Sequence, residues 1–261
     1  MTTPRLLHSQ LLSHVPHAFT TRVGGISSGV FSSLNFGNPG DLPSPQRDPA
    51  SNIAANFAST LAAINCNGRE IVEVYQVHGP VVHSVRPGQP AHPTPSDTRA
   101  DAIVTDDPTR VLVIRTADCA PVLLASTDGR VVAAVHAGWR GVLAGIIPNA
   151  VASMRELGAT HIAASIGPCI GPDAFEVGPE VAAEFRRAFG TTTPHVRPSP
   201  SHADKFHADI PGAIRQQLAE AAIALTDDLK MCTVANGELF YSHRRDNRVT
   251  GRMAALIACE G

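Results

Sequence analysis

The sequence lacks the cysteine patterns of disulfide-rich and zinc-ribbon proteins. Its cysteines are odd in number, lie far apart and include no Cys-x-x-Cys pair; they are Cys66, Cys119, Cys169, Cys232 and Cys259. Closely spaced or evenly numbered cysteines are typical of disulfide scaffolds and of closed structural zinc sites. We therefore expect reduced cysteines and a cytoplasmic protein.

Long apolar runs and an excess of charge of either sign are also missing. The opening segment, MTTPRLLHSQLLSHV, has no continuous apolar core of the signal-peptide kind, and no run approaches the length of a membrane span. The formal net charge is -2, which leaves no basic footprint for nucleic acid or for an anionic membrane. We expect neither as a partner. A hydrophobic fraction of 43% in 261 residues suits a globular protein with a substantial core.

The apolar patterns predict an α+β fold with mixed β-sheets and packed helices in a single compact domain, residues 1–261. Strands come in adjacent pairs as often as they alternate with helices, which favours mixed sheets over a doubly wound parallel sheet. The predicted strands are 71–75, 81–85, 111–115, 122–125, 131–136, 161–166 and 254–258. The predicted helices are 52–64, 142–157, 179–189 and 210–223.

Proline marks the irregular parts of this pattern. Residues 86–100 and 190–204 are rich in proline and small polar residues, and are predicted to be surface loops or lids. Pro148 interrupts the helix predicted for 142–157 and should kink it, because proline removes a helical hydrogen bond. Neither loop is long enough to establish a domain boundary.

A histidine and an arginine stand at one predicted strand-to-helix corner. In VVAAVHAGWRGVLAGI, an apolar strand ends at His136, and the chain turns through Trp139 and Arg140 into a helix. The first free N–H groups of such a helix attract anions, and arginine adds a permanently charged, fork-shaped donor. The other interpretation is that the glycines only permit the turn and that Arg140 is a surface charge. Spacing alone leaves both open.

Two further polar groups lie at strand ends. His78 follows one predicted strand, and Asp118 and Cys119 lie between two others. A lone cysteine or histidine is usually a packing or hydrogen-bonding residue. Together with His136, however, they admit two functional interpretations. Two imidazoles and a thiolate leave one position of a tetrahedral zinc ion open, as in catalytic sites. Alternatively, Cys119 is a nucleophile activated by a histidine, as in a cysteine hydrolase.

Several longer motifs resemble one known family, the multicopper polyphenol oxidoreductase or laccase-domain proteins, which are also described as purine nucleoside phosphorylases. They are FTTRVGGISSGVFSSLNFG, QVHG, ADAIVTDDPTRVLVIRTADCAPVLL, AVHAGWRG, IGPCIGPDAFEVG, KFHADI and CTVANGELFYSHRRDNRVTGRMAALI. The resemblance covers nearly the whole chain. It implies a zinc ion bound by His78, Cys119 and His136. The family usually has an arginine at the position of Phe57, so this chain departs from the family pattern there and lacks any contact which that arginine makes.

The resemblance also implies a reaction, the phosphorolysis of purine nucleosides such as inosine and adenosine. The transition state has cationic sugar character, and the attacking phosphate requires an anion site. Candidate phosphate ligands are Arg22 and Arg140, together with Arg244 and Arg245 of the SHRRD segment. The partners implied are a small-molecule nucleoside and phosphate, and the chain is expected to be a monomer or a weak homo-oligomer.

Adenosine deamination is also associated with the family. There zinc lowers the pKa of bound water, and an acid or base is required, for which Asp118 and His207 are candidates. Some relatives are described as peptidoglycan editing factors, so an amide hydrolase of muramoyl precursors, using zinc or Cys119, is an alternative. A non-enzymatic protein with a structural zinc is disfavoured by the count of three ligands.

The copper activity in the family name is not supported by the histidine pattern. The 12 histidines are scattered and none forms a His-x-His pair, whereas a laccase needs additional histidine-rich copper sites. A site with nitrogen and sulfur ligands would still take Cu²⁺ in vitro, because copper outcompetes other divalent ions at such ligands. Copper-dependent phenol oxidation is therefore a weak indicator of the physiological reaction.

Overall fold

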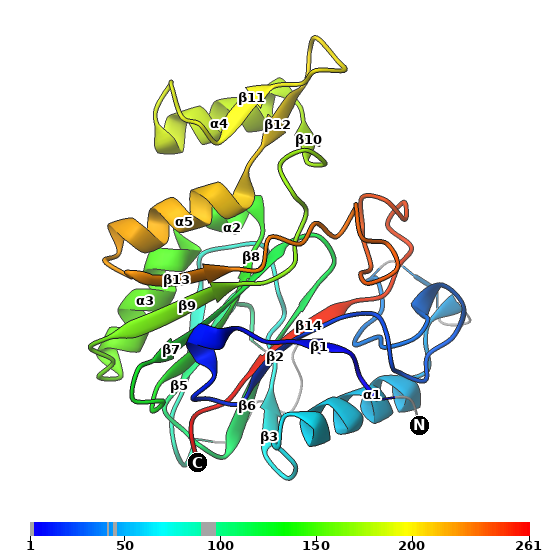
Figure 1. The fold of residues 1–261 in the computed structure, drawn as a ribbon, viewed down its shortest axis with the longest axis vertical. Helices are drawn as coiled ribbons and strands as arrows, with labels where there is room; N and C mark the ends of the chain where they lie inside the picture. Colours follow the sequence, from blue (N-terminus) through cyan, green and yellow to red (C-terminus); the bar gives the residue numbers. More distant parts are fainter. Residues whose placement is uncertain (1–2, 41, 44–45, 90–97) are drawn as a thin grey trace.

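Two β-sheets pack face to face in the computed structural model, which describes residues 3–40, 42–43, 46–89 and 98–261 (Figure 1). The larger sheet has six strands in the order β13-β9-β7-β8-β5-β4, and the second has five in the order β1-β2-β14-β6-β3. The larger sheet comprises β13 (Leu225–Asp228), β9 (Ile162–Ile166), β7 (Ala120–Ser126), β8 (Val132–Ala137), β5 (Ala102–Thr105) and β4 (Val82–Val85). The five-stranded sheet comprises β1 (Leu6–Leu7), β2 (His17–Thr20), β14 (Met253–Ile257), β6 (Arg110–Thr116) and β3 (Glu70–Val72).

Both sheets are mixed, as the sequence predicted. The pairs β4·β5, β9·β13 and β3·β6 are parallel, and the other pairs in these sheets are antiparallel. Together with the packed helices they form a single α+β domain, which confirms the predicted fold class.

Alternation along the buried strands explains the layering. In β7, Val122 and Leu124 pack with the helices, whereas Leu123 and Ala125 pack against the five-stranded sheet. Successive side chains of a strand point to opposite faces, so a strand buried on both faces is apolar throughout. Helices α2 (Trp139–Leu143), α3 (Ile146–Glu156) and α5 (Ile210–Glu220) cover the outer face of the larger sheet. Helix α1 (Ala50–Ala63) covers the outer face of the five-stranded sheet.

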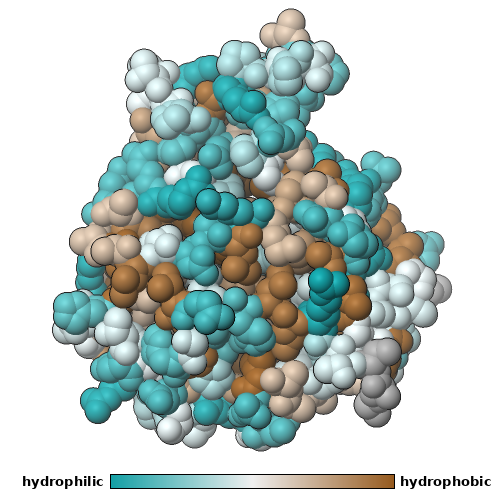
Figure 2. Space-filling model, viewed as in Figure 1, coloured by the Kyte–Doolittle hydropathy of each residue, from teal (hydrophilic) through white to brown (hydrophobic). Residues whose placement is uncertain are grey.

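A small lobe projects beyond these layers, at the top of Figure 1. It contains α4 (Pro179–Phe189) and a three-stranded sheet of β10 (Glu176–Val177), β12 (Phe206–Ala208) and β11 (Val196–Pro198). The lobe is largely hydrophilic on the face shown in Figure 2, whereas hydrophobic residues are more frequent over the body. Two short 3-10 helices, η1 (Gln10–Leu12) and η2 (Gly29–Phe31), complete the elements. No helix among the described residues is long and apolar enough to cross a membrane.

The helix predicted for 142–157 is wrong as a single element. The chain breaks at Gly145, whose φ of 87° lies in the left-handed region, and this break separates α2 from α3. Pro148 is the third residue of α3, where its missing N–H costs no helical hydrogen bond. The predicted kink is therefore a complete break three residues earlier, and glycine rather than proline causes it.

Other boundaries also differ from the predictions. The strand predicted for 71–75 ends at Val72, and Tyr75 forms only an isolated bridge with Arg99. The loop predicted for 190–204 contains β11, which pairs with β12. Most of the other predicted loop, 86–100, lies outside the described residues. Strands β1, β2, β5 and β10 to β13 were missed, because several are too short for an alternating pattern to be recognised.

Candidate metal centre and substrate cavity

Three side chains from distant parts of the chain converge on one point. The ligand atoms of His78, Cys119 and His136 all lie within 4.8 Å of one another. The two imidazole rings stand edge to face, with centroids 4.8 Å apart and planes at 80°. Two nitrogens and a sulfur at this separation could hold a metal ion, so the structure brings together the predicted ligands.

The strand register produces this convergence. Strands β7 and β8 are antiparallel, and Ala120 pairs with Ala137. Cys119, directly before β7, therefore lies opposite the end of β8, where His136 points into the same space. His78 lies in the loop between β3 and β4 with a φ of 62°. This left-handed conformation is uncommon for a residue other than glycine, and such residues concentrate at functional sites.

Asp101 joins two of the ligands, and sequence reasoning missed it. Its Oδ1 atom lies 2.8 Å from Nδ1 of His136 and accepts the backbone N–H of His78 at 2.8 Å, while Oδ2 accepts the N–H of Gly79 at 2.7 Å. Because Nδ1 of His136 donates its hydrogen bond to Asp101, Nε2 is the nitrogen that is left to bind a metal ion. A signal existed, since this aspartate directly precedes an apolar strand.

Cys119 and Asp101 give the cluster two anionic groups, which favour a bound cation. Burial alone raises the pKa of the Cys119 thiol, but the neighbouring His136 and His78 lower it to about 6. Burial lowers the pKa of His136, but the Cys119 thiolate and Asp101 raise it to about 9. The pKa of Asp101 lies below its usual value although burial opposes this, because His136 and backbone N–H groups stabilise the carboxylate. A thiolate with two imidazoles fits zinc or another borderline metal ion.

Gly138 makes room for the cluster. A Cβ atom at this position would lie 3.0 Å from Cδ2 of His78 and 3.1 Å from Sγ of Cys119. Both distances are shorter than ordinary contacts between carbon or sulfur atoms, so any side chain would displace a ligand. The glycine before Trp139 thus allows His78 and Cys119 to lie close to the backbone at this corner.

The cluster lies in the wall of a cavity of about 550 Å³. Its lining contains aromatic rings of Tyr75, Trp139 and Phe175 beside the three ligands. Four arginines and a histidine also line it, namely Arg115, Arg140, Arg244, Arg252 and His243. A concave site with apolar rings and a few convergent polar groups is typical of small-molecule binding.

With this geometry established, comparison with known proteins identifies the family. Residues 16–260 match the family model described as multi-copper polyphenol oxidoreductase laccase. The chain belongs to this laccase family. The resemblance predicted from the sequence motifs is confirmed.

Several similar proteins are named purine nucleoside phosphorylase and not laccase. The chain is 39% identical to a purine nucleoside phosphorylase of Deinococcus radiodurans over 93% of this chain and 88% of the relative. It is 38% identical to purine nucleoside phosphorylase YfiH of Escherichia coli strain K12, over 91% of each chain. Among solved structures, YlmD of Geobacillus stearothermophilus matches with a TM-score of 0.85 and 27% identity over 100% of both chains. These names suggest an enzyme acting on a small molecule.

Two of the predicted phosphate ligands line the cavity of this laccase-family chain. Arg140 is exposed and stacks on Trp139, with its guanidinium carbon 4.3 Å from the ring centroid. Arg244 is also exposed, and its Nη1 donates to the backbone carbonyl of Glu176 at 2.9 Å. Both present a cationic group to the cavity, as an anion site requires.

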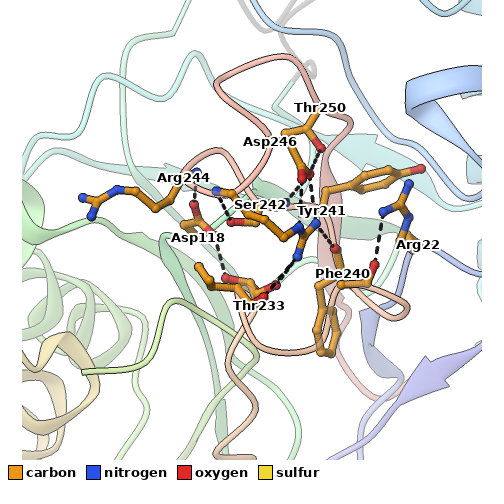
Figure 3. Close-up of polar contacts among 12 residues, drawn as sticks. Arg22, Asp118, Thr233, Phe240, Tyr241, Ser242, Arg244, Asp246 and Thr250 are labelled. Carbon is orange, nitrogen blue, oxygen red and sulfur yellow. Dashed lines mark hydrogen bonds and ion pairs between the residues drawn. The ribbon is translucent and has the colours of Figure 1, made fainter. Parts of the chain in front are cut away.

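The other two predicted phosphate ligands do not line this cavity. Arg22 stacks on Tyr241 at 4.5 Å and donates to the carbonyls of Ser32 and Gly237. Arg245 donates to the carbonyls of Thr233 and Phe240 and pairs with Asp246. Figure 3 shows Arg22 and Arg244 at opposite ends of this network. Arg22 and Arg245 hold the C-terminal loop together, which a sequence motif cannot distinguish from ligand binding.

Asp118 lines the cavity, but both of its carboxylate oxygens are engaged. One accepts the hydroxyl of Thr233 at 2.6 Å, and the other accepts the backbone N–H of Arg244 at 2.7 Å (Figure 3). Its φ of 90° is strained. This aspartate therefore fixes Arg244 and the turn before Cys119, in addition to any role as acid or base.

His207 and Phe57 lie elsewhere. His207, on β12, contacts the carbonyl of Pro172 at 3.0 Å through Nδ1, and is not among the described residues that line the cavity. Phe57 is buried against Phe36, with ring centroids 4.9 Å apart, and also does not line it. Phe57 therefore packs in the core beneath α1 and does not contribute to the cavity.

Sequence reasoning also missed Arg115 and Arg252, whereas His243 belongs to the SHRRD segment that the motifs had singled out. Arg115 ends an apolar run just before TADC, and a charged residue there was a usable signal. The pKa of His243 is lowered, first by burial and then by nearby Arg252. The cavity is thus more cationic than the sequence motifs indicated.

Proposed function

We propose that the chain is a zinc-dependent purine nucleoside phosphorylase that cleaves inosine- and adenosine-type nucleosides. The convergence of His78, Cys119 and His136 in the wall of a cationic cavity carries this proposal. Relatives named purine nucleoside phosphorylase support it. Three ligands would leave one position of a tetrahedral zinc ion open, so an ion held by His78, Cys119 and His136 would supply Lewis-acid chemistry.

The protein groups have distinct tasks in this reaction. A phosphate oxygen forms the bond to the anomeric carbon of ribose as the bond to the purine nitrogen breaks. The purine leaves with the bonding electron pair and gains the proton that dihydrogen phosphate gives up. Arg140 binds and orients the phosphate, while Trp139 and Phe175 offer aromatic faces for the planar base. Asp118 positions the backbone of Arg244 at the rim.

The same cavity supports two related proposals. Deamination of adenosine requires water in place of phosphate, so it would depend on the metal ligands but not on the anion site. An amide hydrolase acting on muramoyl precursors is favoured by one observation, the lowered pKa of Cys119, which makes a thiolate nucleophile available near neutral pH. The proposal includes zinc as the native metal and a cytoplasmic location. All five cysteines are unpaired, which agrees with a reducing compartment.

The deciding experiment compares substrates on one preparation of known zinc content. Inosine with orthophosphate should give hypoxanthine and ribose 1-phosphate, and omission of orthophosphate should stop cleavage. Adenosine should be tested for ammonia release and a muramoyl amino acid precursor for amide cleavage. Release of free ribose, or turnover of the muramoyl compound alone, would overturn the phosphorylase proposal.

A further inference from the structure

We propose that Arg115 and Arg252 form a second anion site in this cavity, which binds a phosphoryl group in the form of orthophosphate or of a phosphate ester on the nucleoside. The inference rests on the proposed function only in taking this cavity as the substrate site. Both arginines line it together with the metal ligands. Neither belongs to the corner at Arg140.

Neighbouring strands bring the two arginines together. Arg115 lies on β6, and Arg252 directly precedes β14, its antiparallel neighbour, in which Met253 pairs with Thr116. The backbone of Arg115 is held by Gln76, which accepts its N–H and donates to its carbonyl, both at 2.8 Å. The arginine is thus mounted on rigid scaffold, as a binding residue requires.

Gly37 shows how close the two side chains lie. A Cβ atom on Gly37 would be 3.1 Å from Nη1 of Arg115 and 3.6 Å from Cγ of Arg252. Both arginine side chains therefore lie beside the backbone of Gly37. The loop that carries Gly37 lines the same cavity. The two side chains flank one small region of the wall.

The protein neutralises the positive charge of this region only in part. Arg115 pairs with Glu73, Nε to Oε1 at 3.1 Å. Arg252 donates Nη1 to the carbonyls of Thr250 and Gly251 at 3.0 Å, and has no carboxylate partner among the described residues. The two guanidinium groups thus have one ion-paired carboxylate between them, and the Cys119 thiolate and Asp118 act on Arg252 without pairing with it. Like charges in a partly enclosed cavity repel each other, and a bound anion removes that repulsion.

The pKa of Arg252 agrees with this distribution of charge. Its pKa is lowered first by burial and also by Arg115, while the Cys119 thiolate raises it. Its Nε and Nη2 groups have no hydrogen bond to the described protein groups, so they are available to oxygen atoms of a ligand. Phosphoryl oxygens match arginine donors in charge and geometry.

The site differs from the one proposed at Arg140. Arg140 is exposed and stacks on an aromatic ring, whereas Arg115 and Arg252 are partly buried. Charges that are less exposed are screened less by salt. The cavity therefore offers an outer and an inner anion site. Two such sites match a reaction whose substrates carry two phosphoryl groups, or a reaction in which a single phosphoryl group moves from one site to the other.

Binding measurements on the zinc-loaded protein test the inference. Dissociation constants for orthophosphate, adenosine 5′-monophosphate and adenosine should be measured by calorimetry for wild type, Arg115→Met and Arg252→Gln. We expect each variant to weaken binding of a phosphoryl ligand by roughly tenfold or more, with adenosine unchanged. Arg187→Met is the matched control, because Arg187 also pairs with one carboxylate, that of Glu184, but lies on α4 outside the cavity.

The pattern of losses identifies the source of the phosphoryl group. Weaker orthophosphate binding assigns the site to free phosphate, and weaker nucleotide binding alone assigns it to a phosphate ester. Binding of both ligands within twofold of wild type in both variants would overturn the inference. If Arg252→Gln does not fold, Gly37→Ala takes its place, since the added methyl group must displace Arg115. Because binding is measured without turnover, failure of the phosphorylase proposal would leave this result interpretable.

Discussion

Asp101 and His136 form a buried carboxylate–imidazole pair, with Oδ1 and Nδ1 2.8 Å apart. The same carboxylate accepts the backbone N–H groups of Val77, His78 and Gly79. One side chain therefore orients a metal ligand on β8 and also fixes the loop that carries another. Carboxylates that hold metal-binding histidines set both the tautomer and the ring orientation.

Replacement of Asp101 by Asn should weaken zinc binding about 10- to 100-fold, because the amide cannot accept all of these hydrogen bonds. A chelator competition assay measures the change. Asp48→Asn is the matched control, since Asp48 is also buried and accepts side-chain hydrogen bonds from Ser27 and Asn35 away from the cavity. It should lose stability but keep its zinc affinity. Equal zinc affinity in Asp101→Asn and wild type would contradict the orienting role.

Replacement of Cys119 by Ala separates the ligand from the nucleophile interpretation. As a ligand, Cys119 is needed for both metal and activity, so the variant should lose both, and chelation of wild type should stop turnover reversibly. Zinc content and turnover are the measurements. Cys232→Ala should keep both, because Cys232 is outside the cluster. Metal-stripped wild type that stays active and shows a covalent adduct by intact mass would make Cys119 a nucleophile.

Replacement of Gly138 by Ala should lower zinc affinity by about tenfold or more, because ligand positions tolerate shifts of only about 0.2 Å. The added methyl would lie 3.0 Å from His78 and 3.1 Å from Cys119. Gly79→Ala is a close control, since its methyl would meet Asp101 at an ordinary 3.7 Å. If both variants bind zinc as wild type does, the cluster is more adaptable than the packing indicates.

Replacement of Arg140 by Lys keeps the charge but removes the planar fork, so the KM for phosphate should rise by about tenfold or more. Zinc content should stay near wild type, and Arg140→Ala should impair phosphorolysis further while sparing any deamination. Arg186→Lys is the control, because Arg186 also stacks on a ring, that of Phe206, but outside the cavity. Equal loss of both reactions would show that Arg140 positions the nucleoside instead.

His17 predicts a pH dependence of stability unrelated to the metal. Its Nε2 accepts the backbone N–H of Ser9 at 2.9 Å, so the buried ring is neutral, and burial lowers its pKa below 6.5, with His8 and His14 adding to the effect. A histidine with a lowered folded pKa binds fewer protons folded than unfolded. Its contribution is therefore complete above pH 6.5 and is lost as the pH falls toward the folded pKa.

The measurement is the free energy of unfolding by denaturant between about pH 5 and pH 7 for wild type and His17→Gln. Wild type should lose stability relative to the variant as the pH falls. His161→Gln, at an exposed position, should follow wild type across the range. A wild-type difference from His17→Gln that does not change with pH would refute the buried neutral histidine.

The sequence by itself determined the α+β class, the long buried strands and the three residues that converge on one point of the cavity. Apolar runs on β7 and β8 predicted buried strands, and polar residues where those runs end predicted functional groups, because strand ends carry side chains to the surface of a rigid sheet. The long motifs, compared with a known family, predicted the ligand set. Short strands such as β2 and β13 were beyond this reasoning, since their length carries too little periodicity.

Only the tertiary structure decided which polar groups share a cavity. His78, Cys119 and His136 meet because the β7–β8 register and the loop held by Asp101 bring distant segments together. The same packing turns Arg22 and Arg245 toward backbone carbonyls of the C-terminal loop. It also exposes Arg115 and Arg252 to the cavity, through strands that are neighbours in space but far apart in sequence. Local residue patterns specify secondary structure and chemistry, whereas strand pairing, which depends on long-range contacts, specifies the site.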